Sequence, residues 1–208
     1  MILGFDHLAW SVSDTDAAAR ELAGRGYRST FDERGAANNA AKHGLLDVYR
    51  PTHDLALYRA DDGRPAIEVT NHGAVSSHTT GPYRIVGTEI ALDTLDVQVE
   101  ETFWCHMLAF RRVEAGHITL KRPVVEWSCT IRLHAVNAPK RATLDSAGHC
   151  CLALLTNTLD RDLERATEAG ATDATAIFAQ PVNGRALRIA LFRTPGGAIF
   201  ELIEVEKK

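Results

Sequence analysis

Two histidines and two glutamates occupy corresponding places near the two ends of this chain. His7 and Glu68 lie early and late in the first third, and His149 and Glu201 lie early and late in the last third. Imidazole nitrogens and carboxylate oxygens are common ligands of divalent metal ions. The recurrence therefore predicts two copies of one structural unit that hold a metal ion between them.

Each residue type also has an ordinary role that weighs against a metal site. A single histidine in a strand is usually a hydrogen-bonded core residue, and a single glutamate late in a strand usually lies at its rim. Glu68 and Glu201 lie in apolar runs, however, where a carboxylate is costly to bury unless a partner neutralises it. Because both residue types recur together, we favour a shared cation.

The pattern around these residues predicts a helix between strands in each copy. Residues 5–12 alternate in polarity, and 14–24 follow with a capping oxygen, good helix formers and a terminal glycine. The segment Asp61-Asp62-Gly63 predicts a hairpin turn between two further strands. The last third repeats this order, with a helix at 159–169 and a tight turn at 194–197. The expected strands of these two copies are 5–12, 54–59, 66–70, 150–155, 186–192 and 198–204, with a weak strand at 27–31 or 46–49.

Strand alternation predicts which side chains share a face of the sheet. Glu68 is expected on the concave face with Ala66 and Thr70, while Ile67 and Val69 pack under the helix. The same rule groups His7 with Phe5 and Ala9, and His149 with Cys151 and Ala153.

The middle of the chain is predicted to be a degenerate third copy. Strands are expected at 86–92, 117–120 and 130–136 around a helix at 97–108. Its two ligand positions hold Glu89 and Arg132. The chain thus divides into a first βαβββ module at 1–78, a degenerate middle module at 83–137 and a last βαβββ module at 146–208.

The composition is that of an ordinary globular protein. Hydrophobic residues make up 45% of the 208 residues and charged residues 24%. The net charge of -4 gives no basic surface for nucleic acid, and no apolar run is long enough to span a membrane. The first residues lack the features of a signal peptide, so we expect a cytoplasmic protein. The four cysteines form no CxxC pair and are expected to be buried thiols: Cys105, Cys129, Cys150 and Cys151.

Short segments of the chain resemble the vicinal-oxygen-chelate superfamily, which includes glyoxalase, bleomycin-resistance and extradiol-dioxygenase proteins. The matching segments are 5–9, 63–68, 103–110, 148–151 and 194–202. The resemblance implies an α+β fold in which repeated βαβββ modules form a cupped, barrel-like mixed sheet, as in glyoxalase. It also implies a divalent metal ion, which could be iron, zinc, nickel or manganese, with His7, Glu68, His149 and Glu201 as ligands.

Three modules leave the pairing open, because that superfamily pairs its modules in even number. If the first and last modules pair, all four ligands meet. If the middle and last modules pair, His149 and Glu201 are left with Glu89, and the first module pairs elsewhere, for example across a dimer. We favour the first arrangement.

The resemblance implies a metal-dependent enzyme that acts on a small substrate chelated through two vicinal oxygens. The chemistry would be that of a lyase or isomerase with an enolate-like intermediate, and Glu68 or Glu201 would be the catalytic group that moves the proton. A small molecule is therefore the expected partner, and a homodimer remains an open expectation.

Two alternatives stay open. One is a ferrous extradiol-type dioxygenase with His7, His149 and Glu201 as iron ligands, and with His117 or His134 as an additional acid–base group. The other is a metal-free resistance protein that binds a drug or natural product. In that case aromatic residues would line its pocket, namely Trp10, Trp104, Trp127 and Phe200.

Overall fold

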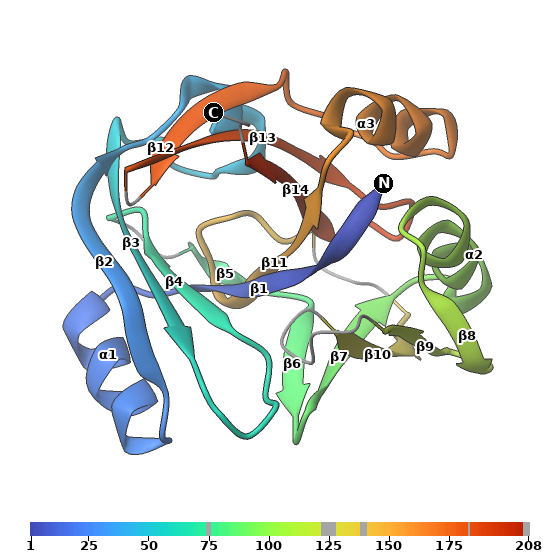
Figure 1. Cartoon of the computed structure of the whole chain (residues 1–208), viewed down its shortest axis with the longest axis horizontal. Coiled ribbons are helices and arrows are strands. Elements are labelled where there is room, and N and C mark those ends of the chain that lie inside the picture. The colour runs from blue at the N-terminus through green and yellow to red at the C-terminus, as the bar shows by residue number, and fades with distance from the viewer. Residues whose placement is uncertain (74–75, 122–127, 138–140, 183, 206–208) are drawn as a thin grey trace.

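The computed structural model describes residues 1–73, 76–121, 128–137, 141–182 and 184–205. Its strands form one curved, mixed sheet, and the α-helices lie on the outside of the curve (Figure 1). This is the α+β fold with a cupped sheet that the sequence predicts. None of the described helices is long and apolar enough to cross a membrane.

The first third of the chain folds as a βαβββ unit. Its elements are β1 (Ile2–Ser11), α1 (Thr15–Gly24), β2 (Arg28–Ala37), the short 3-10 helix η1 (Ala40–Leu45), β3 (Thr52–Arg59) and β4 (Ile67–Asn71). Asp14 caps α1 by accepting a hydrogen bond from the backbone of the first helical turn. Ile67 and Val69 pack with the helix, as alternation predicts, while Glu68 and Thr70 line the concave side of the sheet.

The last third repeats that order. Its elements are β11 (Ser146–Thr156), α3 (Leu159–Glu168), β12 (Phe178–Val182), β13 (Arg185–Arg193) and β14 (Ile199–Val205). Leu159 and Ala166 of α3 are buried in the core, with Leu163 packed beside it, as their helical spacing predicts. In both units the first and last strands run parallel and side by side.

The middle of the chain forms a third unit of the same kind. Its elements are β7 (Glu89–Thr94), α2 (Val97–Met107), β8 (Arg111–Glu114), β9 (His117–Leu120) and β10 (Cys129–Ala135), preceded by β5 (Ser76–Thr80) and β6 (Tyr83–Val86). β7 runs parallel to β10, as β1 does to β4. The middle unit joins the rest of the sheet through β6, which pairs with both β7 and β11.

The first and last units meet through β1 and β11, which pair antiparallel. The strands in the order β2-β3-β4-β1-β11-β14-β13-β12 then wrap around a cup, and the middle unit lies beside it (Figure 1). This is the module pairing that we favour from the sequence, and it is completed within one chain. The residue limits of the three modules remain a proposal.

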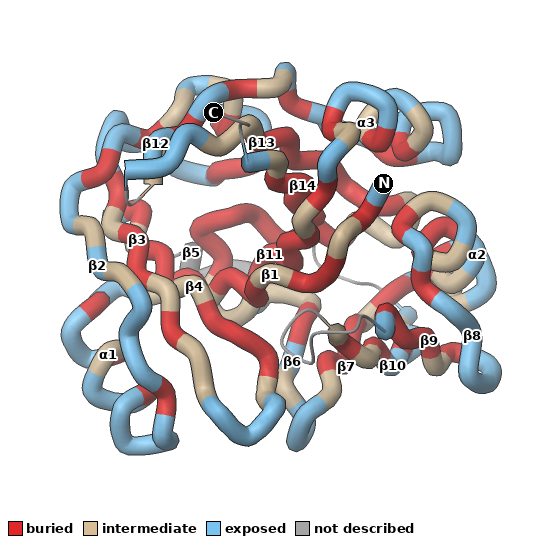
Figure 2. The backbone as a smooth tube through the Cα atoms, in the orientation of Figure 1, coloured by how far each residue is buried: buried red, intermediate tan, exposed pale blue. Residues whose placement is uncertain are grey.

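The core lies on both sides of the sheet, and its buried segments run along β1 and β11 in the centre (Figure 2). Trp104 and Phe200 belong to the large cluster that packs with α2 and α3, so they are core residues. Trp10 packs against the cluster that includes residues of α1, and Trp127 lies outside the described residues. Three of the four cysteines are buried, as predicted, and Cys105 is half-buried.

The structure differs from the predicted strands in three places. The weak strand of the first unit is β2, and 46–49 forms no strand. The predicted strand at 86–92 is broken at Gly87, whose φ of 64° makes a turn, so that β6 and β7 form a hairpin. The edge strands β5, β8 and β12 were not predicted, because short edge strands carry little apolar alternation.

Candidate metal centre

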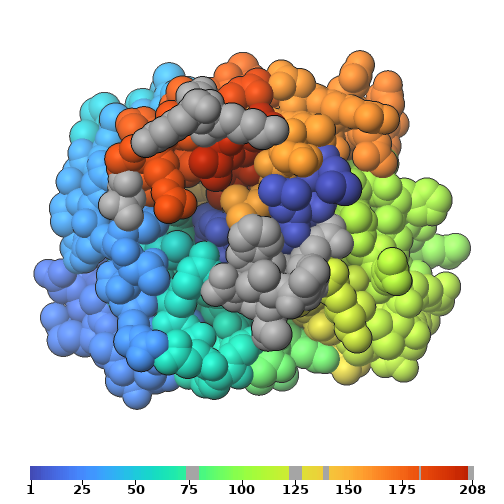
Figure 3. Space-filling view, viewed as in Figure 1, coloured from blue at the N-terminus to red at the C-terminus, as the bar shows by residue number. Residues whose placement is uncertain are grey.

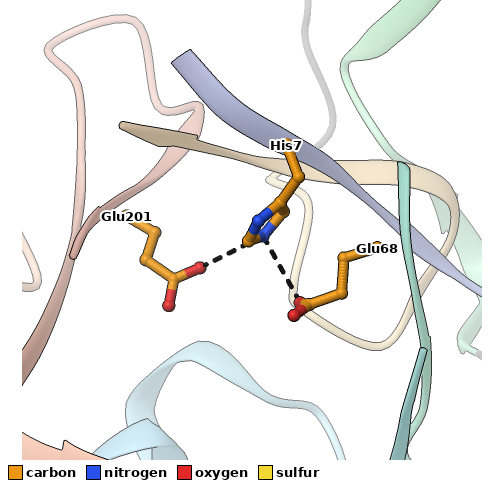
Figure 4. Close-up of side chains that lie close together, drawn as sticks. All are labelled: His7, Glu68 and Glu201. Carbon is orange, nitrogen blue, oxygen red and sulfur yellow. Dashed lines mark ion pairs between the residues drawn. The ribbon is translucent and has the colours of Figure 1, made fainter. Parts of the chain in front are cut away.

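His7, Glu68 and Glu201 converge from three strands inside the cup (Figure 4). Nε2 of His7 lies 3.4 Å from Oε2 of Glu68 and 3.7 Å from Oε2 of Glu201. One ligand atom from each residue lies within 4.8 Å of the other two. The side chain of His7 is only 4% exposed, and those of Glu68 and Glu201 are 17% and 11% exposed.

The Nε2 atom of His7 is buried and makes no hydrogen bond with the described residues. The two carboxylates face it without completing a hydrogen bond. A buried polar atom normally has a partner, because leaving it unpaired costs about 1–3 kcal/mol. One nitrogen and two carboxylate donors aimed at a common point fit a divalent cation.

The other ring nitrogen of His7 is held in place by Asp6. Nδ1 lies 2.8 Å from Oδ2 of Asp6, and Oδ1 of Asp6 lies 3.4 Å from Nη2 of Arg59. A carboxylate on Nδ1 fixes the tautomer that leaves the lone pair on Nε2, which is how histidine ligands of metals are commonly oriented. Asp6 is therefore a positioning residue that the sequence analysis missed.

Asp6 reaches this position because β1 carries a β-bulge there. Phe5 pairs with Leu154 and His7 pairs with Ala153, so Asp6 is an extra residue in β1. The bulge reverses the alternation. Phe5 therefore lies in the large core cluster, whereas we expected it to share a face with His7.

The charges of the cluster depend on one another. Burial alone would lower the pKa of His7, but the charge of Glu68 and the hydrogen bond to Asp6 outweigh it and raise that pKa well above 6.5. Burial alone would raise the pKa of Glu68, but its attraction to His7 lowers that pKa. A proton on His7 therefore offsets part of the negative charge, and a bound cation would replace that proton.

His149 does not join this cluster. A second bulge at Cys150 lies between the pairs Ala9–Cys151 and Trp10–His149, and it turns His149 to the opposite face of the sheet from Cys151. His149 lines a separate cavity of about 150 Å³ beside α1, where its ring centroid lies 5.9 Å from that of Trp10. Burial and the charge of Arg25 lower its pKa to about 4.

The strand registers show which residue truly corresponds to His7. Ala9 lies opposite Glu68 in the first unit, and Ala153 lies opposite Glu201 in the last. Counting back two residues from each alanine gives His7 and Cys151. The last unit therefore places a cysteine where the first unit has its histidine, and His149 corresponds to the core residue Phe5.

In the middle unit the same positions hold an ion pair. Ala91 lies opposite Arg132, which sets Glu89 at the place of His7. Arg132 donates to Glu89, and His117 lies 3.6 Å from the same carboxylate. His117 thus belongs to the middle unit and His134 is exposed, so neither of the predicted acid–base histidines reaches the cup.

Two other histidines face the cluster instead. A cavity of about 40 Å³ beside Glu68 and Glu201 is also lined by Lys42, His53 and His72. The signal for them was present in the sequence. Alternation from Glu68 reaches His72, and the hairpin register that pairs 54 with 71 sets His53 opposite it.

A wider hollow opens above this cavity at the face of the molecule (Figure 3). Its volume is about 920 Å³, and Leu57, Leu187 and Ile203 are among its lining residues. Each lies two positions along its strand from a residue that lines the inner cavity: Leu55, Ile189 and Glu201. The hollow therefore lies on the concave side of the same three strands as the inner cavity.

Comparison with known proteins supports the fold. Methylmalonyl-CoA epimerase from Mycobacterium tuberculosis matches with a TM-score of 0.50 and 15% identity over 100% of this chain and 91% of that one. A second methylmalonyl-CoA epimerase structure matches with a TM-score of 0.47 and 12% identity over 100% and 98% of the two chains. Glyoxalase I from Zea mays matches with a TM-score of 0.40 and 17% identity over 97% and 67%. No family model and no curated protein matches the sequence.

These identities show the fold alone. Together with the paired βαβββ units, the match to methylmalonyl-CoA epimerase at a TM-score of 0.50 confirms the cupped fold that the resemblance predicts.

Proposed function

We propose that this protein is a metal-dependent enzyme that acts on a small substrate through two adjacent oxygens. The observation that carries the proposal is the buried, unpaired Nε2 of His7, which faces Glu68 and Glu201 inside a cup. His7, Glu68 and Glu201 would hold the ion, with His149 outside the set. The donor atoms suit zinc, manganese, nickel or iron alike.

The balance of charge supports a cation at this place. Asp6, Glu68 and Glu201 bring three carboxylates together in a buried region. Burying an unpaired carboxylate is strongly unfavourable, so this arrangement calls for positive charge beyond that of Arg59 and Lys42. Three protein ligands leave positions open for the two oxygens of a substrate.

In such a site a bound metal ion would act as a Lewis acid toward the chelated oxygens. The proton transfer itself would fall to Glu68 or Glu201, whose carboxylates line the inner cavity, and the glutamate with this role would leave the ion to act as the base. Asp6 keeps His7 in one orientation throughout. Chemistry of the lyase or isomerase type follows from this assignment.

The two alternatives have less support. The dioxygenase hypothesis relied on two histidines and one carboxylate, and His149 lies on the other face of the sheet. The drug-binding hypothesis relied on aromatic residues that line a pocket, but Trp104 and Phe200 lie in the core instead. A small substrate is the better fit.

Metal analysis tests the proposal directly. Protein purified without chelators or nickel affinity should contain about one divalent ion per chain. His7→Ala and Glu201→Ala should each weaken metal binding by more than tenfold, about 1.4 kcal/mol or more. His149→Ala is the matched control and should retain the metal, since it removes a half-buried imidazole from the opposite face.

Catalysis is tested with a panel of small 2-oxo and 2-hydroxy compounds. The metal-loaded protein should exchange a carbon-bound hydrogen for solvent deuterium in at least one of them, and Glu68→Gln or Glu201→Gln should abolish the exchange. Metal content unchanged by His7→Ala would contradict the proposal.

A further inference from the structure

The inner cavity beside the carboxylate cluster is also lined by three basic side chains. Lys42 is 8% exposed, and His53 and His72 are each 3% exposed. All three line the same cavity as Glu68 and Glu201. We call Lys42, His53 and His72 the cationic wall.

Lys42 is a buried cation that lacks an ion-pair partner among the described residues. Its ammonium lies 5.7 Å from the centroid of the Phe178 ring, a weak interaction that leaves its hydrogen-bond donors unused. The charge of Lys42 reaches Glu68, whose pKa it lowers, but no carboxylate of the described residues lies within ion-pair distance of the ammonium. A lysine that is largely buried in this way has room for a further negative partner.

The two histidines are equally incomplete. Both ring nitrogens of His53 and Nδ1 of His72 are buried without a hydrogen-bond partner in the described part of the chain. Burial, reinforced by the charge of Lys42, lowers the pKa of His53 to about 2 and that of His72 to about 4. Both rings are therefore neutral at pH 7, and the one N–H of His53 has no acceptor among the described residues. The hydroxyl of Thr70 faces the cavity in the same unpaired state.

A second metal ion could also use histidine nitrogens, but Lys42 argues against it. The field of its ammonium reaches both rings, as the lowered pKa values of His53 and His72 show, and that field repels a cation. An anion accepts hydrogen bonds from the ammonium, from the imidazoles and from the hydroxyl together.

We propose that the cationic wall binds the carboxylate of the substrate, so that the substrate is a small 2-oxo or 2-hydroxy carboxylate. This inference rests on the proposed function. One carboxylate oxygen and the neighbouring keto or hydroxyl oxygen would face the metal centre, and the second carboxylate oxygen would face Lys42. A cavity of about 40 Å³ has room for a head group of a few atoms, and a longer tail would extend into the wider hollow.

Glycolate and glycolamide form a suitable pair of ligands for the test. They have the same shape and the same two adjacent oxygens, and they differ in the charge that Lys42 would recognise. Calorimetric titration of the metal-loaded protein gives the ratio of their affinities. Because the metal also prefers the carboxylate, the informative quantity is the change in this ratio between variants.

We expect Lys42→Met to lower the glycolate preference by tenfold or more without changing metal content. Methionine keeps the apolar stem, which favours folding. His72→Leu should lower the preference about threefold as a second, independent variant. Arg20→Met removes the same charge from the exposed surface of α1 and should leave the preference unchanged.

An unchanged ratio in both Lys42→Met and His72→Leu with the metal retained would overturn the inference and leave the proposed function standing. Two metal ions per chain, reduced to one by His72→Leu, would overturn it in favour of a second metal site. If the wild-type protein holds no metal, the proposed function fails. The same titrations on the metal-free protein then test the anion site by itself. If Lys42→Met abolishes the preference for glycolate, the anion site is supported. If the preference is unchanged in Lys42→Met, the anion site is refuted.

Discussion

At the scale of single residues, the centre depends on how both nitrogens of one histidine are used. Nδ1 of His7 contacts Asp6 and Nε2 faces the two glutamates, so the ring cannot rotate without losing its partner. Asp6 is in turn anchored by Arg59. The contacts of Asp6 with His7 and Arg59 therefore fix the orientation of the imidazole within the cluster.

Because Asp6 orients His7, replacing Asp6 tests the proposed metal centre without removing a proposed ligand. We expect Asp6→Asn to weaken metal binding by about 10- to 100-fold, because the amide no longer supplies the charge that fixes and polarises His7. Competition with a chelating dye measures the affinity.

Asp32→Asn is the matched control, since Asp32 is also a carboxylate paired with an arginine but lies on the exposed side of β2. Equal metal affinity in Asp6→Asn and the wild-type protein would show that the hydrogen bond to Nδ1 has no role in the centre.

At the scale of elements, strand alternation predicted one half of the centre and misplaced the other. It placed Glu68 and Thr70 on the concave face because β4 is regular over that stretch. It misplaced His149 because a bulge at Cys150 adds one residue, and a single added residue reverses every side chain beyond it. A bulge depends on pairing with a distant strand and leaves no local mark in the sequence.

The glutamates were a better guide to the repeat than the histidines. When the two units are aligned on Glu68 and Glu201 through their strand registers, Ala9 matches Ala153 and His7 matches Cys151. The similar sequence positions of His7 and His149 are a coincidence. The last strand of each unit, which carries the glutamate, is short and regular, so the alternation of its side chains is preserved.

The bulge at Cys150 is packed against a glycine whose replacement should be severe. The backbone N–H of Gly81 donates to the carbonyl of Ala147 at 2.8 Å, and a Cβ at Gly81 would lie 1.8 Å from the carbonyl oxygen of His149. We expect Gly81→Ala to destabilise the protein by about 2 kcal/mol or more, because backbone must move to admit the methyl group. Chemical denaturation measures the change.

Gly24→Ala is the control for the same chemical change at the end of α1, where a Cβ would meet no atom within 4 Å. It should leave the free energy of unfolding unchanged or raise it by up to about 1 kcal/mol, because alanine favours the helix. A similar loss of stability in both variants would mean that β6 does not approach β11 closely.

At the scale of the whole molecule, the three units have diverged in the residue that they place at one equivalent position. The first has His7, the last has Cys151, and the middle has Glu89 paired with Arg132. The repeat was visible in the sequence through its strands and helices, which follow from local periodicity. The first and last units enclose the cup because β1 pairs with β11. This pairing joins segments that are distant in the sequence, so composition and spacing suggest it but do not determine it.

The middle unit contributes none of the proposed ligands, yet it supports the strand that carries Glu201. Glu100 of α2 is fully buried and accepts hydrogen bonds from Nε1 of Trp104 and from the backbone N–H of Gly196, each at 2.8 Å. Gly196 lies in the turn between β13 and β14. Glu100 therefore links the helix of the middle unit to the last hairpin of the cup.

Replacing Glu100 tests this link and separates its geometry from its charge. Glu100→Ala should cost about 2–4 kcal/mol, because two buried N–H groups lose their acceptor. Glu100→Gln keeps one acceptor and removes a buried charge, so it should cost at least about 1 kcal/mol less than the alanine variant. Burial raises the pKa of Glu100 above its ordinary 4.5, despite the hydrogen bonds of Trp104 and Gly196 that favour the charged form.

The sign of the pH dependence follows from that raised pKa. The folded protein binds the proton of Glu100 more tightly than the unfolded chain, so this contribution to stability is complete below pH 4.5 and is lost as the pH rises through the folded pKa. The wild-type protein should therefore lose stability relative to Glu100→Gln as the pH rises from 4.5 to 7, as measured by denaturant unfolding at each pH. A constant difference between the two proteins across this range would show that Glu100 titrates normally and that the contact between the middle unit and the cup is open to water.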